Sequence, residues 1–302
     1  MGVDDGAMPV TGAAGEHLAA DAHVSYAAGD YEAAHRRALA VLEDHPEDLN
    51  TLRLAGRAAF ELGLEDAPTH LRAAAELDPD DADTWFDLAS ALVEAGELRE
   101  ASGGFQNVLR LRPGDAPSLI NLGHAAYVGG STEQAIEYLR QAVEASPGNL
   151  AALRGLVHIF RREGMYDAAL EVAQQVRELA PDDVRAALDV AESALELERY
   201  GEAQAAFASL RALDEDPDHE VYAYHGMIEA AVRRDQWRRA LDLAVDATRV
   251  DRLGRTTDVL AFVVAQVFGD QDRSAPSRGA VEESLAASRR EHRRIHEDAL
   301  VF

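Results

Sequence analysis

The stretch ADTWFDLASALVEAGELREASGGFQNVLRLRPGD, residues 82–115, contains two helical patterns, the first ending at Gly96 and the second at Pro113. Its apolar residues recur at spacings of three and four: Trp85, Leu88, Leu92, Ala101, Phe105 and Val108. Such spacing places side chains on one face of a helix. We therefore expect two helices that pack against each other through these faces.

The same pattern recurs along most of the chain. Alanines stand 33 or 34 residues apart at Ala34, Ala67, Ala101, Ala135, Ala169 and Ala203. Prolines do so at Pro46, Pro79, Pro113, Pro147 and Pro181. A helix pair cannot bury its apolar face alone, so a repeat of this length predicts pairs that stack on their neighbours. The recurring alanine lets the two helices of a pair approach closely, and bulk there should separate them.

These residues resemble the tetratricopeptide repeat family, whose pattern runs W, L, G, Y, A, F, A, P. The resemblance implies an all-α, right-handed superhelical α-solenoid of seven helix pairs plus a C-terminal capping helix pair. Residues 15–254 would form the seven repeats, starting at residues 15, 49, 82, 116, 150, 184 and 221, after a flexible segment, residues 1–14. Residues 255–302 would form the cap, because terminal repeats must present a polar face to water.

Polar residues mark the expected ends of the helices. Gly-Asp-Tyr at 29–31 and Gly-Met-Tyr at 164–166 indicate turns inside repeats, where glycine ends the first helix. Pro-Asp-Asp at 79–81 and 181–183, and Pro-Gly-Asp at 113–115, stand between repeats. Acidic clusters of this kind could bind a metal, but their repetition at each junction favours Asp as the cap of the next helix.

The C-terminal region contains an arginine cluster on an expected helix from about Gly279 to Ala299, with Val281, Leu285 and Ile295 as its docking residues. The cluster consists of Arg289, Arg290, Arg293 and Arg294. Clustered arginines can neutralise nucleic-acid phosphates. The anionic charge of the rest of the chain repels a polyanion and favours docking of this helix on the protein's own acidic residues.

Acidic residues dominate the composition of the 302-residue chain. It has 55 acidic and 29 basic residues, a net charge of -26, and no lysine. Self-repulsion at this charge destabilises a compact chain, and roughly molar salt shortens the screening length to about 3 Å. We interpret the composition as that of a halophilic organism. A high-GC genome would explain arginine in place of lysine, but not the acidic excess.

Motifs of enzymes and cofactor sites are absent from the sequence. It has no cysteine, no phosphate-binding glycine loop, no GxSxG and no HExxH. His292 and His296 have metal-ligand spacing but lack a third ligand, so two surface imidazoles are favoured over zinc. We expect no cofactor and no catalysis. The first 15 residues lack a secretory pattern and the longest apolar run is too short for a membrane span, so we expect a cytoplasmic protein.

The resemblance also implies which residues face the inner groove of the stack: positions 2, 5, 6, 9, 12 and 13 of each first helix. Arginines, histidines and aromatic residues of repeats two to five stand out at these positions, with further polar neighbours. The candidate partner-binding residues are Arg53, Arg57, Phe60, Phe86, Ser90, Asn121, His124, Tyr127, Arg154, His158 and Arg161.

Such residues suit an extended peptide or protein segment with acidic side chains or a free carboxylate, because arginine holds a carboxylate bidentately and aromatic rings bury apolar side chains. Mild acid would charge the histidines and tighten this binding. Alternatively, the arginines pair internally with acidic residues such as Asp83, Asp87 and Glu94. The carboxylate clamp of a better-known subclass is not reproduced, because Arg57 replaces its asparagine and Asn121 lies one repeat too late.

The sequence therefore predicts a non-catalytic protein-interaction scaffold that acts through its groove, with neither nucleic acid nor membrane as partner. Two alternatives remain open at this point. The chain could be a structural protein that assembles with further copies through its C-terminal end. It could also be a regulatory subunit of an enzyme or transcription complex that uses the arginine-rich helix.

Overall fold

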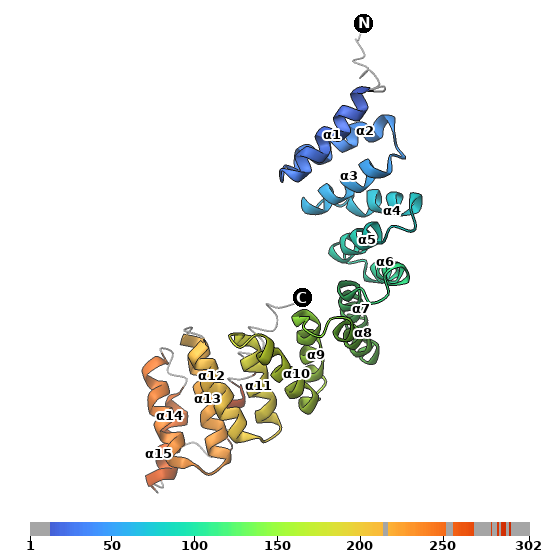
Figure 1. Ribbon diagram of the computed structural model, residues 1–302. Helices are drawn as coiled ribbons and strands as arrows, with labels where there is room; N and C mark the ends of the chain where they lie inside the picture. Colours follow the sequence, from blue (N-terminus) through green and yellow to red (C-terminus); the bar gives the residue numbers. More distant parts are fainter. Residues whose placement is uncertain are drawn as a thin grey trace. The chain divides into compact units, whose positions relative to one another are not determined.

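A computed structural model describes residues 13–213, 217–251 and 256–268, together with residues 279, 283, 285–287 and 290. In these residues all long regular elements are α-helices, which confirms the all-α class (Figure 1). The helices are α1 (Ala13–Ala27), α2 (Tyr31–Asp44), α3 (Leu49–Glu61), α4 (Ala67–Leu77), α5 (Ala82–Glu94), α6 (Leu98–Leu111), α7 (Ala116–Val128), α8 (Thr132–Ala145), α9 (Leu150–Arg162), α10 (Tyr166–Leu179), α11 (Val184–Glu196), α12 (Tyr200–Leu213), α13 (Pro217–Arg233), α14 (Trp237–Val250) and α15 (Thr257–Phe268).

The helices form two compact units, which we describe separately. Unit 1 comprises Met1–Pro147 and unit 2 comprises Gly148–Phe302. Within each unit, consecutive helices pack against each other, so that a first helix and a second helix alternate along the stack. Unit 1 contains the pairs that begin with α1, α3, α5 and α7, and unit 2 those that begin with α9, α11 and α13, followed by α15.

Small buried residues form the contact between the two helices of each pair. The six recurring alanines are all buried, with exposed fractions of 2% or less. Glycine serves the same purpose at Gly56 and Gly123: an added Cβ would lie 2.5 Å from Leu71 Cγ and 2.9 Å from Leu139 Cγ. The helices can approach this closely because nothing larger stands between them.

Aspartates cap the first helices, as the sequence predicts. The carboxylate of Asp115 accepts a hydrogen bond from the backbone N–H of Ser118 at 3.0 Å, and that of Asp183 accepts one from Ala186 at 3.1 Å. Asp81 accepts one from the N–H of Asp83 at 3.1 Å. These bonds satisfy amides that the helix itself leaves unpaired. The recurring acidic clusters at the junctions therefore include helix caps.

The turn between the two helices of a pair requires a left-handed backbone. Gly29 and Gly164 have φ values of 78° and 70° there, which glycine adopts without steric cost. In the last two repeats Glu198 and Asp235 take this place, with φ values of 59° and 56°. A residue with a Cβ pays a conformational cost in this region, and Asp tolerates it better than Glu.

The structure differs from the sequence-based boundaries near the last repeats. Helix α13 begins at Pro217, four residues before the expected repeat start at Val221. Proline fits the first turn of a helix, where its missing N–H would have no intrahelical partner. Of the expected docking residues of the cap, Leu285 is buried with 1% exposure, whereas Val281 and Ile295 lie outside the described residues.

We predict that Ala203→Leu destabilises unit 2 by about 1–3 kcal/mol, because the added atoms have no space between the helices. Ala203 is fully buried on α12, and Ala208 on the same helix is exposed. Ala208→Leu is therefore the matched control and should change stability by less than about 0.5 kcal/mol. Urea unfolding followed by circular dichroism measures both. Equal midpoints for the two variants would contradict this account of the alanine repeat.

We also predict that Glu198→Gly stabilises the protein by roughly 1 kcal/mol, because glycine removes the steric cost of a positive φ. The reverse change in the preceding repeat, Gly164→Ala, should destabilise by a similar amount, since its backbone has the same conformation. Thermal melting compares the two variants with the parent protein. A lower melting temperature for Glu198→Gly would show that its backbone conformation carries no strain.

Candidate functional site

A small hollow lies among the first helices of unit 1. Its walls come from α1, α3 and α5, with Leu71 of α4 at one side, and its volume is about 200 Å³. We call it the aromatic hollow; it is lined by Tyr26, Arg57, Phe60, Glu61, Leu71, Phe86, Asp87 and Ser90. Four of these, Arg57, Phe60, Phe86 and Ser90, are residues that the sequence predicts as partner-binding.

These side chains lie together because they occupy equal positions in successive repeats. Tyr26 and Phe60 occupy position 12 of successive first helices, and Arg57 and Ser90 occupy position 9. Residues three and four apart share a helix face, so stacked first helices place equal positions beside one another. Phe86 packs edge to face on buried Phe105 with ring centroids 5.6 Å apart, which orients its ring. The hollow therefore combines three half-buried rings with charged groups at its rim.

The groove arginines of unit 1 form ion pairs with aspartates on the next first helix or at its N-cap. Arg57 Nε lies 2.7 Å from Asp87 Oδ2, and Arg53 Nη2 lies 2.9 Å from Asp81 Oδ2. Asp83, which we considered as a partner for these arginines, instead contacts Arg112 at 2.7 Å. Internal pairing is thus the arrangement in this structure. The Arg57 side chain keeps 44% of its surface exposed, so solvent reaches the pair from the hollow.

Burial changes the acidity of two groups that line the hollow. It raises the pKa of the Asp87 carboxyl above its ordinary value, although the positive charge of Arg57 opposes this. The folded protein therefore binds a proton at Asp87 more readily than the unfolded chain does. The ionised carboxylate costs stability at neutral pH, and this cost disappears as the pH falls through the folded pKa. Burial likewise raises the pKa of the Tyr26 hydroxyl.

The next first helix, α7, carries Asn121, His124 and Tyr127, all half-buried. They continue the row of predicted groove residues but do not line the aromatic hollow. Burial lowers the pKa of His124. Its imidazole therefore gains a proton only at a lower pH than an exposed histidine would, which weakens the expectation that mild acid charges it.

Three predicted residues lie in unit 2, where they differ in accessibility. Arg154 is exposed, and its Nε lies 3.1 Å from Asp183 Oδ2; His158 is half-buried. Arg161 is buried with 7% exposure, and its guanidinium bonds both Asp189 and Glu192. The prediction that Arg161 contacts a partner is corrected, because its charge is enclosed and already matched by two carboxylates.

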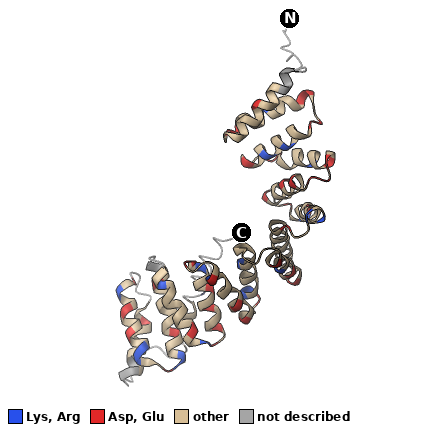
Figure 2. Ribbon diagram, viewed as in Figure 1, with Lys and Arg blue, Asp and Glu red and all other residues tan. Residues whose placement is uncertain are grey.

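The C-terminal arginine cluster falls largely outside the described residues. Arg290 is described and exposed, and its Nη2 lies 2.5 Å from Glu283 Oε1. Arg289, Arg293 and Arg294, as well as the pair His292 and His296, are among the residues that the structure does not describe. Acidic residues, in red, and arginines, in blue, are distributed over the described helices of both units (Figure 2).

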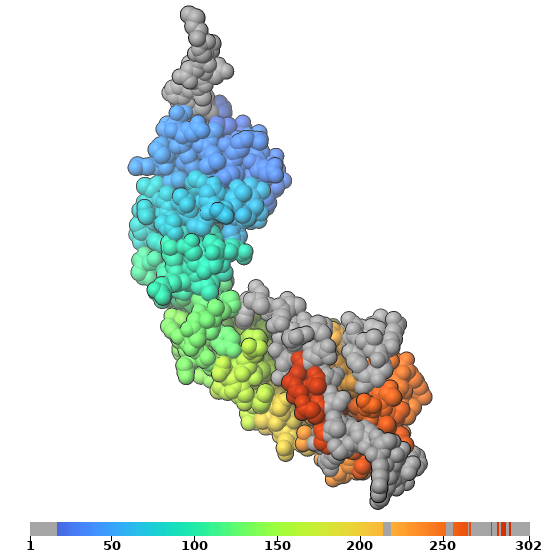
Figure 3. All heavy atoms as spheres, turned by 180° about the vertical axis from the view of Figure 1, so that it is seen from behind, coloured from blue at the N-terminus to red at the C-terminus, as the bar shows by residue number. Residues whose placement is uncertain are grey.

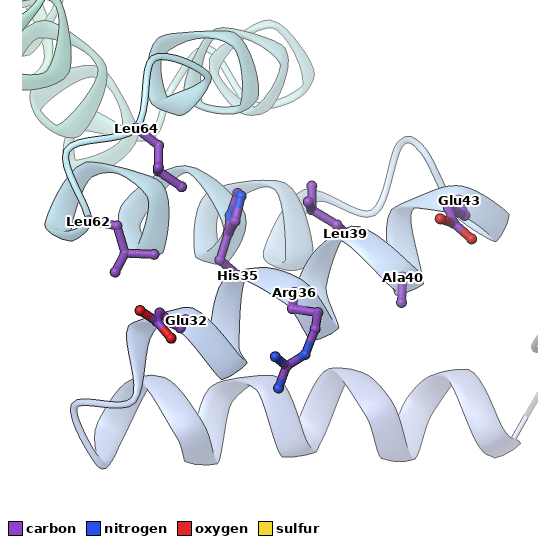
Figure 4. Close-up of a pocket in the computed structure, with 8 residues that line it drawn as sticks. All are labelled: Glu32, His35, Arg36, Leu39, Ala40, Glu43, Leu62 and Leu64. Atoms are coloured by element: carbon purple, nitrogen blue, oxygen red, sulfur yellow. The ribbon is translucent and has the colours of Figure 1, made fainter.

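A second, larger hollow in unit 1 lies beside the second helix α2 and has a volume of about 600 Å³ (Figure 4). Glu32, Arg36 and Glu43 of α2 border it, and Leu62 and Leu64 approach from the turn after α3. His35 forms part of its wall and is held in place: its Nδ1 lies 3.2 Å from the carbonyl oxygen of Ala55, and its Nε2 3.4 Å from Asp66. His35 therefore links neighbouring repeats.

The sequence-based prediction omits four residues of the aromatic hollow: Tyr26, Glu61, Leu71 and Asp87. Tyr26 occupies position 12 of the first repeat, so the repeat phase alone would have selected it. The sequence analysis predicts Asp87 only as a partner for an arginine, and in the structure it is also part of the wall. Among the described side chains, no cluster of three or more histidine and acidic residues has the geometry to hold a metal.

The fold and repeat phase agree with comparisons to known proteins. A family model described as "Tetratricopeptide repeat" matches residues 20–82, 64–116 and 86–149, and a second model with that description matches 129–188 and 160–228. Together these matches extend over residues 20–228. No curated protein is significantly similar to the chain. In the part of the chain that the structure describes, no helix has the length and hydrophobicity to cross a membrane.

Several solved structures share the fold at low sequence identity. A tetratricopeptide repeat protein from Parabacteroides merdae is 16% identical, with a TM-score of 0.57, and the match covers 84% of this chain and 100% of that one. The protein MamA is 23% identical, with a TM-score of 0.53 and coverages of 57% and 94%. YrrB, described as having an unusual peptide-binding site, is 20% identical, with a TM-score of 0.54 and coverages of 62% and 94%.

Proposed function

The chain belongs to the tetratricopeptide repeat family, and we propose that it is a non-catalytic scaffold that binds a protein segment at the aromatic hollow. The observation that carries this proposal is the placement of three half-buried rings beside a solvent-accessible ion pair on adjacent first helices. Proteins of this fold present such surfaces to partners, and the structural relative YrrB is described as having a peptide-binding site.

The size of the hollow points to a side chain as its occupant. Small-molecule and cofactor sites are commonly about 300–1,000 Å³. The aromatic hollow is about 200 Å³, which suits a single apolar side chain. Tyr26, Phe60 and Phe86 would bury such a group, and rigid aromatic anchors of this kind contribute strongly to interfaces.

The ion pair at the rim supplies a preference for acidic partners. Arg57 is nearly half exposed, and exposed ion pairs contribute little to stability. A carboxylate of a bound peptide can therefore replace Asp87 as the partner of Arg57. The exchange is favoured because burial disfavours the ionised form of Asp87, which can take up a proton when its partner leaves. The partner that fits best is an extended peptide with an apolar residue next to an acidic one.

We predict that Arg57→Glu weakens binding of such peptides by tenfold or more, because a lost charge-assisted hydrogen bond costs about 1.5–3 kcal/mol. The measurement is affinity for an array of short peptides in which apolar and acidic positions vary. Arg99 lies exposed on the second helix α6, so Arg99→Glu makes the same charge change away from the hollow and should leave affinity unchanged.

Phe60→Ala tests the anchoring ring separately. This substitution should weaken the binding of peptides that have a large apolar residue. It should leave the effect of acidic peptide residues on affinity unchanged, because Arg57 is still present. If Arg57→Glu and Arg99→Glu bound the array equally, the hollow would not be the binding site. Helicity by circular dichroism confirms that each variant retains its fold.

We further propose that the protein is adapted to high salt, because at a net charge of -26 its acidic side chains repel one another in dilute buffer. The melting temperature should rise steeply from low to multimolar KCl, because salt at about 1 M reduces the screening length to roughly 3 Å. A thermal melting series in KCl measures this. A melting temperature independent of KCl would leave the acidic composition without a role in salt adaptation.

A further inference from the structure

The inner positions 5, 9 and 12 of α11 and α13 in unit 2 differ from those of the first helices of unit 1; α9 is intermediate, with Arg154 exposed, His158 half-buried and Arg161 buried. In unit 1 none of these positions is buried: those of α3 are Arg53, Arg57 and Phe60, and those of α5 are Phe86, Ser90 and Val93. The same is true of α1 and α7. In unit 2 the equivalent positions of α11 and α13 are all buried, with exposed fractions of 8% or less. They are Leu188, Glu192, Leu195, His225, Glu229 and Val232.

The helix pairs alone do not explain this burial. The pairs of unit 1 pack in the same order and leave their inner positions accessible. The inner positions of α11 and α13 therefore have a contact that those of unit 1 lack. Thr256, just before α15, supplies one such contact: it is fully buried, and its Oγ1 lies 3.2 Å from Nε2 of the inner residue His225. Leu285 is 1% exposed and belongs to the large buried apolar cluster of unit 2, which also contains Leu188, Leu195 and Val232. The described part of the C-terminal segment, in red, lies on unit 2 (Figure 3).

The described residues between 279 and 290 have the pattern of a helix with one buried side. They are helical, Leu285 is buried, and Glu283, Ala287 and Arg290 are exposed. Arg290 pairs with Glu283, so charged groups of this segment meet each other on its outer side. Such a distribution is that of an amphipathic helix on a protein surface.

The buried inner surface of unit 2 contains charged groups. A buried charge without a partner lowers the stability of a protein. Arg161 bonds Asp189 and Glu192, and the Tyr222 hydroxyl donates to Glu192. Arg185 adds a contact with Asp189 at 3.3 Å. Glu192 is itself an inner position of α11, and Arg161 occupies the inner position 12 of α9. Arg161, Asp189, Glu192 and Tyr222 are all buried, so this network is shielded from water and matched internally.

We propose that the C-terminal segment around Leu285 is an intramolecular ligand of unit 2, occupying the surface formed by the inner positions of α11 and α13. The segment closes this surface to other proteins. A partner helix with a leucine-like residue on one side reaches it only by displacing the segment. Unit 2 is thus a second binding surface under autoinhibition, distinct from the aromatic hollow of unit 1.

The test uses the absence of cysteine from the full chain. Leu188→Cys introduces a thiol at an inner position, and its reaction with a water-soluble thiol reagent should be slow. Adding Leu285→Asp places a charge in the apolar contact and should speed this reaction at least tenfold. Ala287→Asp adds the same charge at an exposed neighbour and should leave the rate unchanged.

The substitution Ala206→Cys introduces a second reporter thiol, which shows whether Leu285→Asp unfolds the protein. Ala206 is buried on the second helix α12, so its thiol should stay protected in the Leu285→Asp background. If that thiol also reacts, Leu285→Ala replaces Leu285→Asp in the same comparison. A synthetic peptide of residues 279–302 should restore protection of the Leu188→Cys thiol. Equal rates at that thiol with and without the Leu285 substitution, and no effect of the peptide, would overturn the proposal.

Discussion

Close approach of two helices at a buried alanine or glycine is the contact on which the rest of this structure depends. It fixes the separation of each pair at positions such as Ala101 and Gly123, and the next pair can then stack on the surface that remains. Since every repeat places this contact at the same position, equal positions of successive first helices face the same way. The rows of inner residues follow from that repetition rather than from any contact with a ligand.

Electrostatics adds a second link between repeats. Asp81 and Asp183 cap the helices that follow them and also pair with Arg53 and Arg154 of the preceding repeats. One carboxylate thereby satisfies a helix end and an arginine. These pairs are partly exposed, so their contribution to stability is small. Each of these arginines thus lies at a partly exposed surface beside a carboxylate of the same chain.

The two units use one repeat pattern in different ways. The inner positions of unit 1 are accessible and form the aromatic hollow, where Phe60 and Phe86 stand beside Arg57. Those of α11 and α13 are buried and include the carboxylate of Glu192, which bonds Arg161. We attribute the difference to the segment around Leu285, which joins the buried apolar cluster of unit 2. A single scaffold thus contains an open surface and a covered one.

The sequence by itself determined the helix pairs, because periodic apolar residues, alanines and capping aspartates are local signals that recur in each repeat. It also selected Arg57, Phe60 and Phe86, because repeat phase fixes which positions share a face. Only the tertiary structure decided that Arg57 pairs with Asp87 and that Arg161 is enclosed. Which carboxylate meets an arginine depends on the stacking of neighbouring repeats. The sequence also selected Leu285 as a docking residue, but not the surface that it joins, because a contact between segments far apart in the chain is not encoded by the local pattern.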